Sequence, residues 1–563
     1  MARASSSALR RVTRTRGLAL AVAAALVALT GTATARGDTP APAGEPPTTA
    51  ATTAAEAAGD IVFSEPSGTF EGGIAVGLST AIAGAEIHYT TDGEPPTAES
   101  PRYEGTPLDL TATTELRAAA FVDGAATGEP GTALYVARSL DATSDLPLLV
   151  MDAYGAGKPD REYVDVATLL MEPGSGEAAL SAEPTLATRA GFHLRGQSSS
   201  MFEKAPYRLE FWDEEDDDLD HELLGMPADS DWVLRGPFSD KTLVHDAFAY
   251  GLGRDLGLAA PRFAFVELYL NVEDRPMTAD DYQGVYMVAE TIKISEDRLD
   301  LTELADTDLA EPEVTGGYVF SFEWQAAEEP TVPCPGGGAD CWSDLELREP
   351  SELEPEQRSW LSDHLYGLHQ ALRGPDPADP ATGYPAYLDV DSFVDHVIVN
   401  ELTREMDSYV RSTYFHKDRE GPIVAGPLWD YDLVLGTGGY FDNLNTAGWQ
   451  YQQPRPGGSD WYALLMNEPS FVERVAARWT ELRQGTLSDA QLNARIDALT
   501  QPLAASAARN FERWPNLTDP FVGPFITPTE PTWEGQVAYM RDWLERRAGW
   551  LDSSGWAPDA GRG

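Results

Sequence analysis

Hydrophobic and polar residues alternate with different periods in different parts of this chain. In the N-terminal part, strand-like runs recur at 73–78, 86–90, 114–121 and 132–136, and turn-forming residues separate them. The regular spacing of short runs predicts a small all-β module, an immunoglobulin-like sandwich over residues 60–140.

The pattern from residue 141 to residue 563 is mixed. An apolar run at 145–154 predicts a buried strand, and an alternating run at 204–212 predicts a half-buried strand. Further strands are expected at 192–199, 262–271 and 284–292, and helices at 243–258, 392–407 (with Ser392 as N-cap), 469–484 and 533–551. These elements predict one large α+β domain with a helical C-terminal part.

The first 35 residues have the order of a secretory signal peptide. Four arginines between residues 10 and 16 precede the apolar run 17–29, and an A-x-A site follows at 33–35. The apolar run is shorter than the roughly 20 residues that a membrane-spanning helix needs. We therefore expect a secreted or cell-surface protein with no membrane span after cleavage, and a disordered Pro/Ala/Thr linker over 36–59.

The composition is strongly acidic, with 40 Lys and Arg against 91 Asp and Glu and a net charge of −51. Because nucleic acids are bound mainly by basic surfaces, no nucleic acid is expected as a partner. A nucleotide site stays open if a few basic groups gather in one cleft. The two cysteines, Cys334 and Cys341, flank a Pro/Gly-rich loop, and export favours a disulfide between them.

Three acidic residues surround a predicted hairpin in the segment 407–432. Residues 412–417 and 421–429 read as two strands with a turn at 418–421, so the hairpin would bring Asp407 and Asp430 together, with Asp432 beside them. Divalent cations such as Mg²⁺ take carboxylate oxygens, and phosphoryl transfer needs a carboxylate to orient the acceptor hydroxyl. The alternative is that these acids cap turns at the hairpin rim.

The segment 87–103, IHYTTDGEPPTAESPRY, resembles the small module found at the C-terminus of chitobiases and hexosaminidases. The matching residues are Tyr89, Thr90, Asp92, Gly93, Pro96, Thr97, Ser100 and Tyr103. Two roles stay open for this module: contact with a glycan or the cell wall, or a spacer that holds the main domain off a surface.

The larger domain resembles the CotH kinase family of atypical protein kinases. The resemblance is carried by RGQSS at 195–199, KAPYR at 204–208, LLGMPADSDWVLRGPFSDKT at 223–242, NELTREMDSYVRSTYFHKD at 400–418 and GPLWDYD at 426–432. It implies a diverged protein-kinase-like fold, ATP and Mg²⁺ as cofactors, and phosphorylation of Ser or Thr in a protein substrate. Asp407 then matches the family's catalytic aspartate, and Asp430 its metal-binding aspartate, with Asp432 next to it.

The phosphate-binding residues are sought among basic side chains inside the same motifs. The candidates are Arg195, Lys204, Arg208 and Lys241, with Glu290 as the acid that would position one of them. Lys204 and Arg208 are expected to share one face of a strand. Salt bridges on an acidic surface are the alternative for each residue.

Two further segments qualify this interpretation. Where the family commonly has Arg-Asn, this chain has His245 and Asp246, so its nucleotide binding is expected to differ or to be weak. The acidic run 213–222 lacks the glycine and the terminal glutamate of a calcium loop, and we expect a solvated turn there.

Two functions follow from these observations. The first is an exported protein kinase, favoured by the three aspartates. The second is a catalytically silent surface or wall-binding scaffold, favoured by the scarcity of ATP outside cells. A carbohydrate-active enzyme ranks last, because the module that suggests it is an accessory domain.

Overall fold

The structure is a computed structural model that describes residues 60–323, 330–337, 341–342, 345–453 and 460–556. The predicted signal peptide and linker lie outside these residues. None of the helices in these ranges is both long enough and apolar enough to cross a bilayer.

Residues 61 to 138 form the expected all-β module around a core that includes Ile61, Val76, Leu116 and Tyr135. Its main sheet has the order β2-β9-β7-β5, with β8 on β7, and two strand pairs, β1 with β4 and β3 with β6, complete it. The strands are β1 (Ile61–Phe63), β2 (Gly68–Glu71), β3 (Ile74–Val76), β4 (Leu78–Thr80), β5 (Glu86–Thr90), β6 (Leu108–Leu110), β7 (Thr114–Val122), β8 (Ala125–Ala126) and β9 (Gly131–Arg138).

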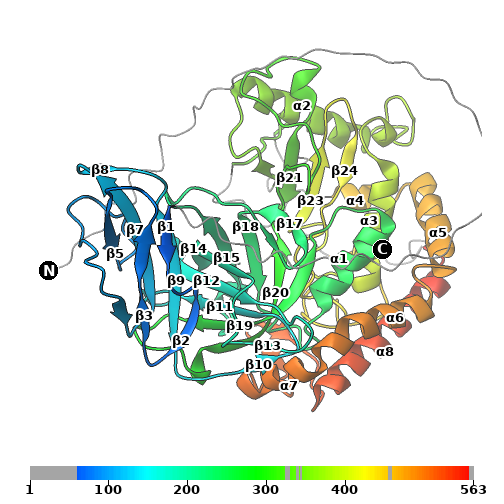
Figure 1. Cartoon of the computed structure of the whole chain (residues 1–563). Helices are drawn as coiled ribbons and strands as arrows, with labels where there is room; N and C mark the ends of the chain where they lie inside the picture. Colours follow the sequence, from blue (N-terminus) through cyan, green and yellow to red (C-terminus); the bar gives the residue numbers. More distant parts are fainter. Residues whose placement is uncertain (1–59, 324–329, 338–340, 343–344, 454–459, 557–563) are drawn as a thin grey trace, which may run out of the picture. The chain divides into compact units, whose positions relative to one another are not determined.

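The large domain begins with a closed barrel of seven strands, drawn in cyan to green in Figure 1. In barrel order the strands are β11 (Leu148–Asp152), β12 (Val164–Met171), β14 (Leu186–Leu194), β15 (Tyr207–Trp212), β18 (Asp231–Arg235), β20 (Tyr282–Glu290) and β19 (Phe263–Asn271). Parallel pairing of β11 with β19 closes the barrel, with Leu148 opposite Glu267, whereas the other pairs are antiparallel. Short pairs lie outside it: β10 (Thr143–Ser144) with β13 (Ala178–Ala179), and β16 (His221–Leu223) with β17 (Met226–Asp229).

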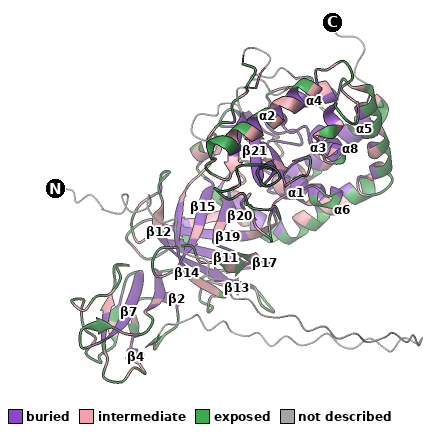
Figure 2. Cartoon of the chain, turned by 90° about the horizontal axis from the view of Figure 1, so that it is seen from above, coloured by how far each residue is buried: buried purple, intermediate pink, exposed green. Residues whose placement is uncertain are grey.

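A second sheet and the helices follow the barrel. The sheet has the order β22 (Leu345–Glu349), β21 (Tyr318–Phe322), β23 (Thr413–Lys417) and β24 (Ile423–Ala425). The helices are α1 (His245–Leu256), α2 (Pro355–Ala371), α3 (Val390–Thr403), α4 (Trp461–Leu465), α5 (Pro469–Arg483), α6 (Asp489–Thr500), α7 (Ala504–Arg513) and α8 (Trp533–Ser554). In Figure 2, α3 is largely buried, whereas α5 and α6 expose one side. The mixture of strands and helices agrees with the predicted α+β class.

The start of helix α3 differs from the prediction. The N-cap is Asp389, whose carboxylate accepts a hydrogen bond of 2.9 Å from the backbone N–H of Ser392. Both residue types cap helices well, and the aspartate that comes first takes the position. The helix ends at Thr403, so Asp407 lies in the loop after it and not on the helix.

The acidic run 213–222 is not only a solvated turn. Glu214 accepts a hydrogen bond of 2.8 Å from Arg117 of the β-module. Nearby, Arg189 of the barrel pairs at 2.6 Å with Glu115 of the module, and both side chains are almost fully buried. The turn therefore takes part in a contact between the module and the barrel.

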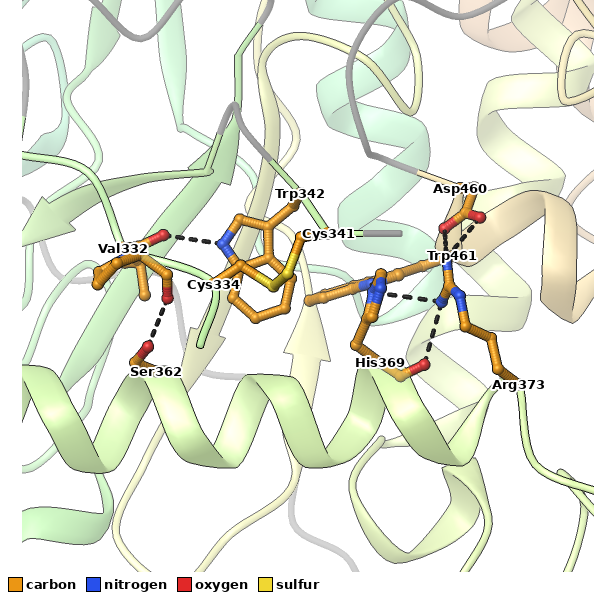
Figure 3. Close-up of a disulfide and its surroundings, with 10 residues drawn as sticks. Val332, Cys334, Cys341, Trp342, Ser362, His369, Arg373, Asp460 and Trp461 are labelled. Carbon is orange, nitrogen blue, oxygen red and sulfur yellow. Dashed lines mark hydrogen bonds and ion pairs between the residues drawn. A yellow bond between two sulfur atoms is a disulfide. The ribbon is translucent and has the colours of Figure 1, made fainter. Parts of the chain in front are cut away.

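The disulfide between Cys334 and Cys341 is present, as the sequence predicted. Figure 3 shows it close to helix α2, from which Ser362 and His369 project. Trp342 donates to the carbonyl of Val332 at 2.8 Å, which fixes the two ends of the cysteine loop.

We expect the double substitution Cys334→Ser with Cys341→Ser to lower the free energy of unfolding by less than about 3 kcal/mol, because the closed loop is short. Chemical denaturation of the purified protein with its disulfide formed measures this loss. A larger loss would mean that the bond does more than restrict the unfolded loop.

Candidate functional site

The predicted hairpin around residues 412–429 is confirmed. Strands β23 and β24 pair antiparallel, with Phe415 opposite Ala425 and Lys417 opposite Ile423. At the open end of the hairpin, the hydroxyl of Ser412 donates to Oδ2 of Asp430 at 3.1 Å. The fold therefore brings the segment after Asp407 to Asp430, as the spacing predicted.

Asp430 occupies an unusual backbone position and pairs with arginine. Its φ is +59°, in the left-handed region, and its N–H donates to the hydroxyl of Tyr250 at 3.3 Å. Nη1 of Arg235 lies 2.8 Å from Oδ1 of Asp430. Burial alone would raise the pKa of Asp430, but the positive charges of Arg235 and Arg195 outweigh it and hold this pKa below its ordinary value.

Asp432 lies among other carboxylates. Burial, and then the negative charges of Asp246 and Asp430, raise the pKa of Asp432 to about 8, and Asp407 adds to this repulsion. Its Oδ2 accepts a hydrogen bond of 3.2 Å from the hydroxyl of Ser239. Three carboxyl groups are thus close enough to influence that of Asp432. We call these four residues the carboxylate cluster.

Asp407 is held in its loop by local contacts. Its backbone N–H donates to Oε1 of Glu405 at 2.8 Å, and Arg411 lies 4.0 Å from its Oδ2. Asp407 and Asp430 both act on the carboxyl group of Asp432, so the structure brings the three aspartates into one region.

Two arginines flank the ring of Trp429 beside this cluster. The guanidinium carbon of Arg235 lies 4.4 Å from the ring centroid, and that of Arg195 lies 5.3 Å from it. Burial and the neighbouring Arg235 lower the pKa of Arg195 to about 10. Nε and Nη2 of Arg235 are buried and have no hydrogen-bond partner among the described residues. Such donors suit an anion that carries several oxygens.

Arg235 was not predicted as a site residue, although it lies inside the segment 223–242 quoted above. Its place at the end of β18, directly before a glycine, was the available signal. Glu323 was missed too. It accepts a hydrogen bond of 3.2 Å from the N–H of Ser412, and burial raises its pKa to about 7.

The other basic candidates are engaged elsewhere. Lys204 is fully buried, and its Nζ donates to the side chain of Asn510 at 2.7 Å. Lys241 donates to three backbone carbonyls, those of Leu517, Asp519 and Pro528. These contacts do not support a phosphate-binding role for either lysine.

Arg208 and Glu290 also have partners of their own. Arg208 forms an ion pair of 2.6 Å with Asp231. Its positive charge is one of the smaller causes that lower the pKa of Arg195. Glu290 binds the backbone and the guanidinium of Arg262, so it does not position a candidate phosphate ligand. The expected shared face of Lys204 and Arg208 is wrong, because β15 begins only at Tyr207.

The departure at His245 and Asp246 lies inside the site. Nδ1 of His245 is 3.0 Å from the carbonyl oxygen of Asp432. Asp246 accepts a hydrogen bond of 2.8 Å from the N–H of Tyr431, and its Oδ2 lies 3.5 Å from Arg235. Asp246 therefore adds a further carboxylate beside Asp430 and Asp432.

The donor set suits a hard divalent cation that is bound together with phosphates. Across the described ranges, no three His, Cys, Asp or Glu residues are arranged to hold a metal on their own. Mg²⁺ usually takes only one or two protein carboxylates, and the rest of its shell comes from water and substrate phosphates. A cation would also relieve the repulsion that raises the pKa of Asp432.

A small cleft lies near Trp429. Its lining includes Ala259, Pro261, Thr291, Ile292, Leu299 and Pro427, at the point where the chain leaves β20. Ile292 and Leu299 also pack in one apolar cluster with Trp429. The cleft therefore shares lining residues with the apolar cluster that contains Trp429.

Two family models match the chain. The model described as CotH kinase protein matches residues 192–551, well over half of the sequence. The model of the chitobiase/beta-hexosaminidase C-terminal domain matches residues 65–132. No curated protein matches the chain.

Proposed function

This chain belongs to the CotH kinase protein family, and we propose that it is an exported kinase with a diverged protein-kinase-like fold. It transfers the γ-phosphate of ATP to a serine or threonine hydroxyl of a protein. The observation that carries the proposal is the carboxylate cluster beside the two arginines on Trp429. Acids and bases gathered in one place serve phosphoryl transfer, which depends on positioning and charge stabilisation.

Each residue of the site has a role in the proposed reaction. Asp407 orients the acceptor hydroxyl and takes its proton as the hydroxyl oxygen bonds to the γ-phosphorus and the bond to ADP breaks. Arg195 and Arg235 bind phosphate oxygens. Asp430 and Asp432 are the residues that would hold Mg²⁺, which when bound neutralises charge on the phosphates.

One observation favours the alternative, a catalytically silent scaffold. Both carboxylate oxygens of Asp430 already have protein partners, Arg235 and Ser412. Binding of a Mg²⁺-bound nucleotide at Asp430 competes with these contacts, whereas a scaffold keeps both.

Calorimetric titration of the exported protein with ATP, with and without Mg²⁺, separates the two functions. The kinase proposal expects Mg²⁺-dependent ATP binding, and a parent protein without it would be a scaffold.

We expect Arg235→Gln to weaken this binding at least about tenfold, because a charge-assisted hydrogen bond to phosphate is lost. Arg474→Gln, which removes a surface arginine paired with Asp391, is the matched control and should bind as the parent does. Equal affinities of the two variants would remove Arg235 from the phosphate site. Thermal unfolding of both variants shows whether the fold is kept.

A further inference from the structure

Most of the large apolar side chains that are exposed belong to one region of the fold. Across the described ranges, six large hydrophobic residues are exposed, and four of them directly precede or follow, in the chain, a residue of one small apolar cluster or a residue packed against it. The four are Met201, Tyr440, Phe521 and Ile526, with 70, 49, 61 and 37 % of their surface exposed. We call these four residues the apolar ledge.

The ledge rests on well-packed side chains from four separate segments. The cluster beneath it contains Phe202, Met406, Leu433, Val522 and Phe525. Phe525 lies 6.2 Å from Phe202 and 6.3 Å from Tyr440 between ring centroids.

Backbone pairing adds to the rigidity of the ledge. Strands β25 (Phe521–Val522) and β26 (Phe525–Ile526) form a hairpin, and Ile526 exchanges two backbone hydrogen bonds of 2.9 Å with Gly438. Backbone hydrogen bonds therefore hold the segments that carry Phe521 and Ile526 in place.

The cluster beneath the ledge adjoins the carboxylate cluster. Met406 directly precedes Asp407, and Leu433 directly follows Asp432. Phe238, which packs on the same cluster, precedes Ser239, the residue that donates to Asp432. Three separate segments of the chain thus run directly from the cluster beneath the ledge into the site where the acceptor hydroxyl has to arrive.

The arginine side of the site packs in a different apolar cluster. Trp429, which directly precedes Asp430, packs with Val233, Leu299 and Tyr414, next to the small cleft. The chain from Trp429 to Leu433 therefore joins two apolar clusters, and the four carboxylates gather along it. One cluster adjoins the candidate phosphate ligands, and the other carries the ledge.

We propose that the apolar ledge binds the acceptor protein through aliphatic or aromatic side chains that flank the phosphorylated serine or threonine. This inference rests on the proposed kinase function and specifies its substrate. Apolar contact gives affinity without competing for the charged groups of the site. A second copy of this chain is a poorer occupant, because four side chains fall far short of the roughly 800 Å² per partner of a stable interface.

Direct binding tests the ledge without relying on catalysis. The probes are two fluorescein-labelled 12-residue peptides with one central serine, flanked on both sides by Phe and Leu in one peptide and by Ala in the other. Fluorescence anisotropy without nucleotide measures their affinity for the full chain, for Phe521→Ser and for Phe521→Ser with Met201→Ser. Leu309→Ser and Val62→Ser are the matched controls, since these side chains are exposed hydrophobics away from the ledge.

We expect the parent to bind the Phe/Leu peptide at least about tenfold more tightly than the Ala peptide, as buried aromatic anchors carry much of the affinity in interfaces. Phe521→Ser should remove most of that difference, and the control variants should keep it. Mg–ATP affinity of the ledge variants should equal that of the parent.

Three results would overturn the proposal: equal affinity of the parent for both peptides, unchanged discrimination in the ledge variants, or a dimer of the parent that Phe521→Ser converts to a monomer. Failure of Mg–ATP binding by the parent would instead remove the kinase function. The anisotropy result would still decide whether the ledge binds apolar peptides.

Discussion

Replacing Asp407 with Asn should leave Mg–ATP binding intact and lower phosphate transfer to a serine-containing acceptor by about 10²–10⁴-fold, the usual effect of losing a positioned general base. The amide keeps the shape of the side chain and removes its ability to take a proton. Calorimetry measures the binding, and transfer of labelled phosphate to the acceptor measures the turnover.

Asp430→Asn is the variant to compare with Asp407→Asn, because the two residues have different proposed roles. Asn tolerates the left-handed backbone at φ +59°, so the substitution changes charge with little added strain. It should weaken Mg–ATP binding itself, because a charged ligand of the cation is lost. If Asp407→Asn abolishes nucleotide binding while Asp430→Asn spares it, the two roles are assigned in the wrong order.

Replacing Glu401 with Ala should lower the free energy of unfolding by about 3–5 kcal/mol, because it leaves a buried charge without its partner. Glu401 and Arg547 have fully buried side chains, and their charged atoms are 3.1 Å apart. Glu401 also accepts the backbone N–H groups of Gln450 and Tyr451, both at 2.8 Å. The hydroxyl of Tyr409 donates to the same carboxylate at 3.3 Å, so the substitution removes four interactions at once. Chemical denaturation of the full chain measures the loss.

Arg546→Ala is the matched control, because Arg546 directly precedes Arg547, the partner of Glu401, in helix α8. Arg546 pairs with Asp542 at the surface, and both side chains are more than half exposed. Surface pairs of this kind contribute about 0–1 kcal/mol. A loss for Glu401→Ala as small as that of the control would show that loop 445–451 and helix α8 do not depend on this pair.

The sequence was a good guide wherever the signal was local. The hairpin of β23 and β24 followed from alternation and a four-residue turn, and helices α1, α5 and α8 followed from their apolar period. The proximity of Asp407, Asp430 and Asp432 depended only on this hairpin, so it could be predicted from the sequence. Family motifs then gave these residues a role that alternation alone could not give.

Distant contacts decided the rest of the site. Lys204 looked like a phosphate ligand, but its partner Asn510 lies 306 residues away in the sequence. Closure of the barrel by β11 and β19 joins strands more than 100 residues apart. Arg235 reaches Asp430 only because β18 ends beside Trp429. The hydrophobic periodicity of a short segment does not reveal contacts between residues that are far apart in the sequence.

The contacts of the last 60 residues have a consequence for biosynthesis. The amide of Asn510 serves both Lys204 and the backbone of Val285 in the barrel, Lys241 is held by carbonyls beyond residue 516, and Arg547 neutralises Glu401. Chains fold from the N-terminus as the ribosome releases them. Until the segment from residue 510 onward has emerged, Lys241 lacks its three carbonyl partners, Lys204 lacks Asn510, and Glu401 lacks its partner of opposite charge. A nascent chain that is arrested or truncated before residue 510 should remain a substrate for chaperones and proteases.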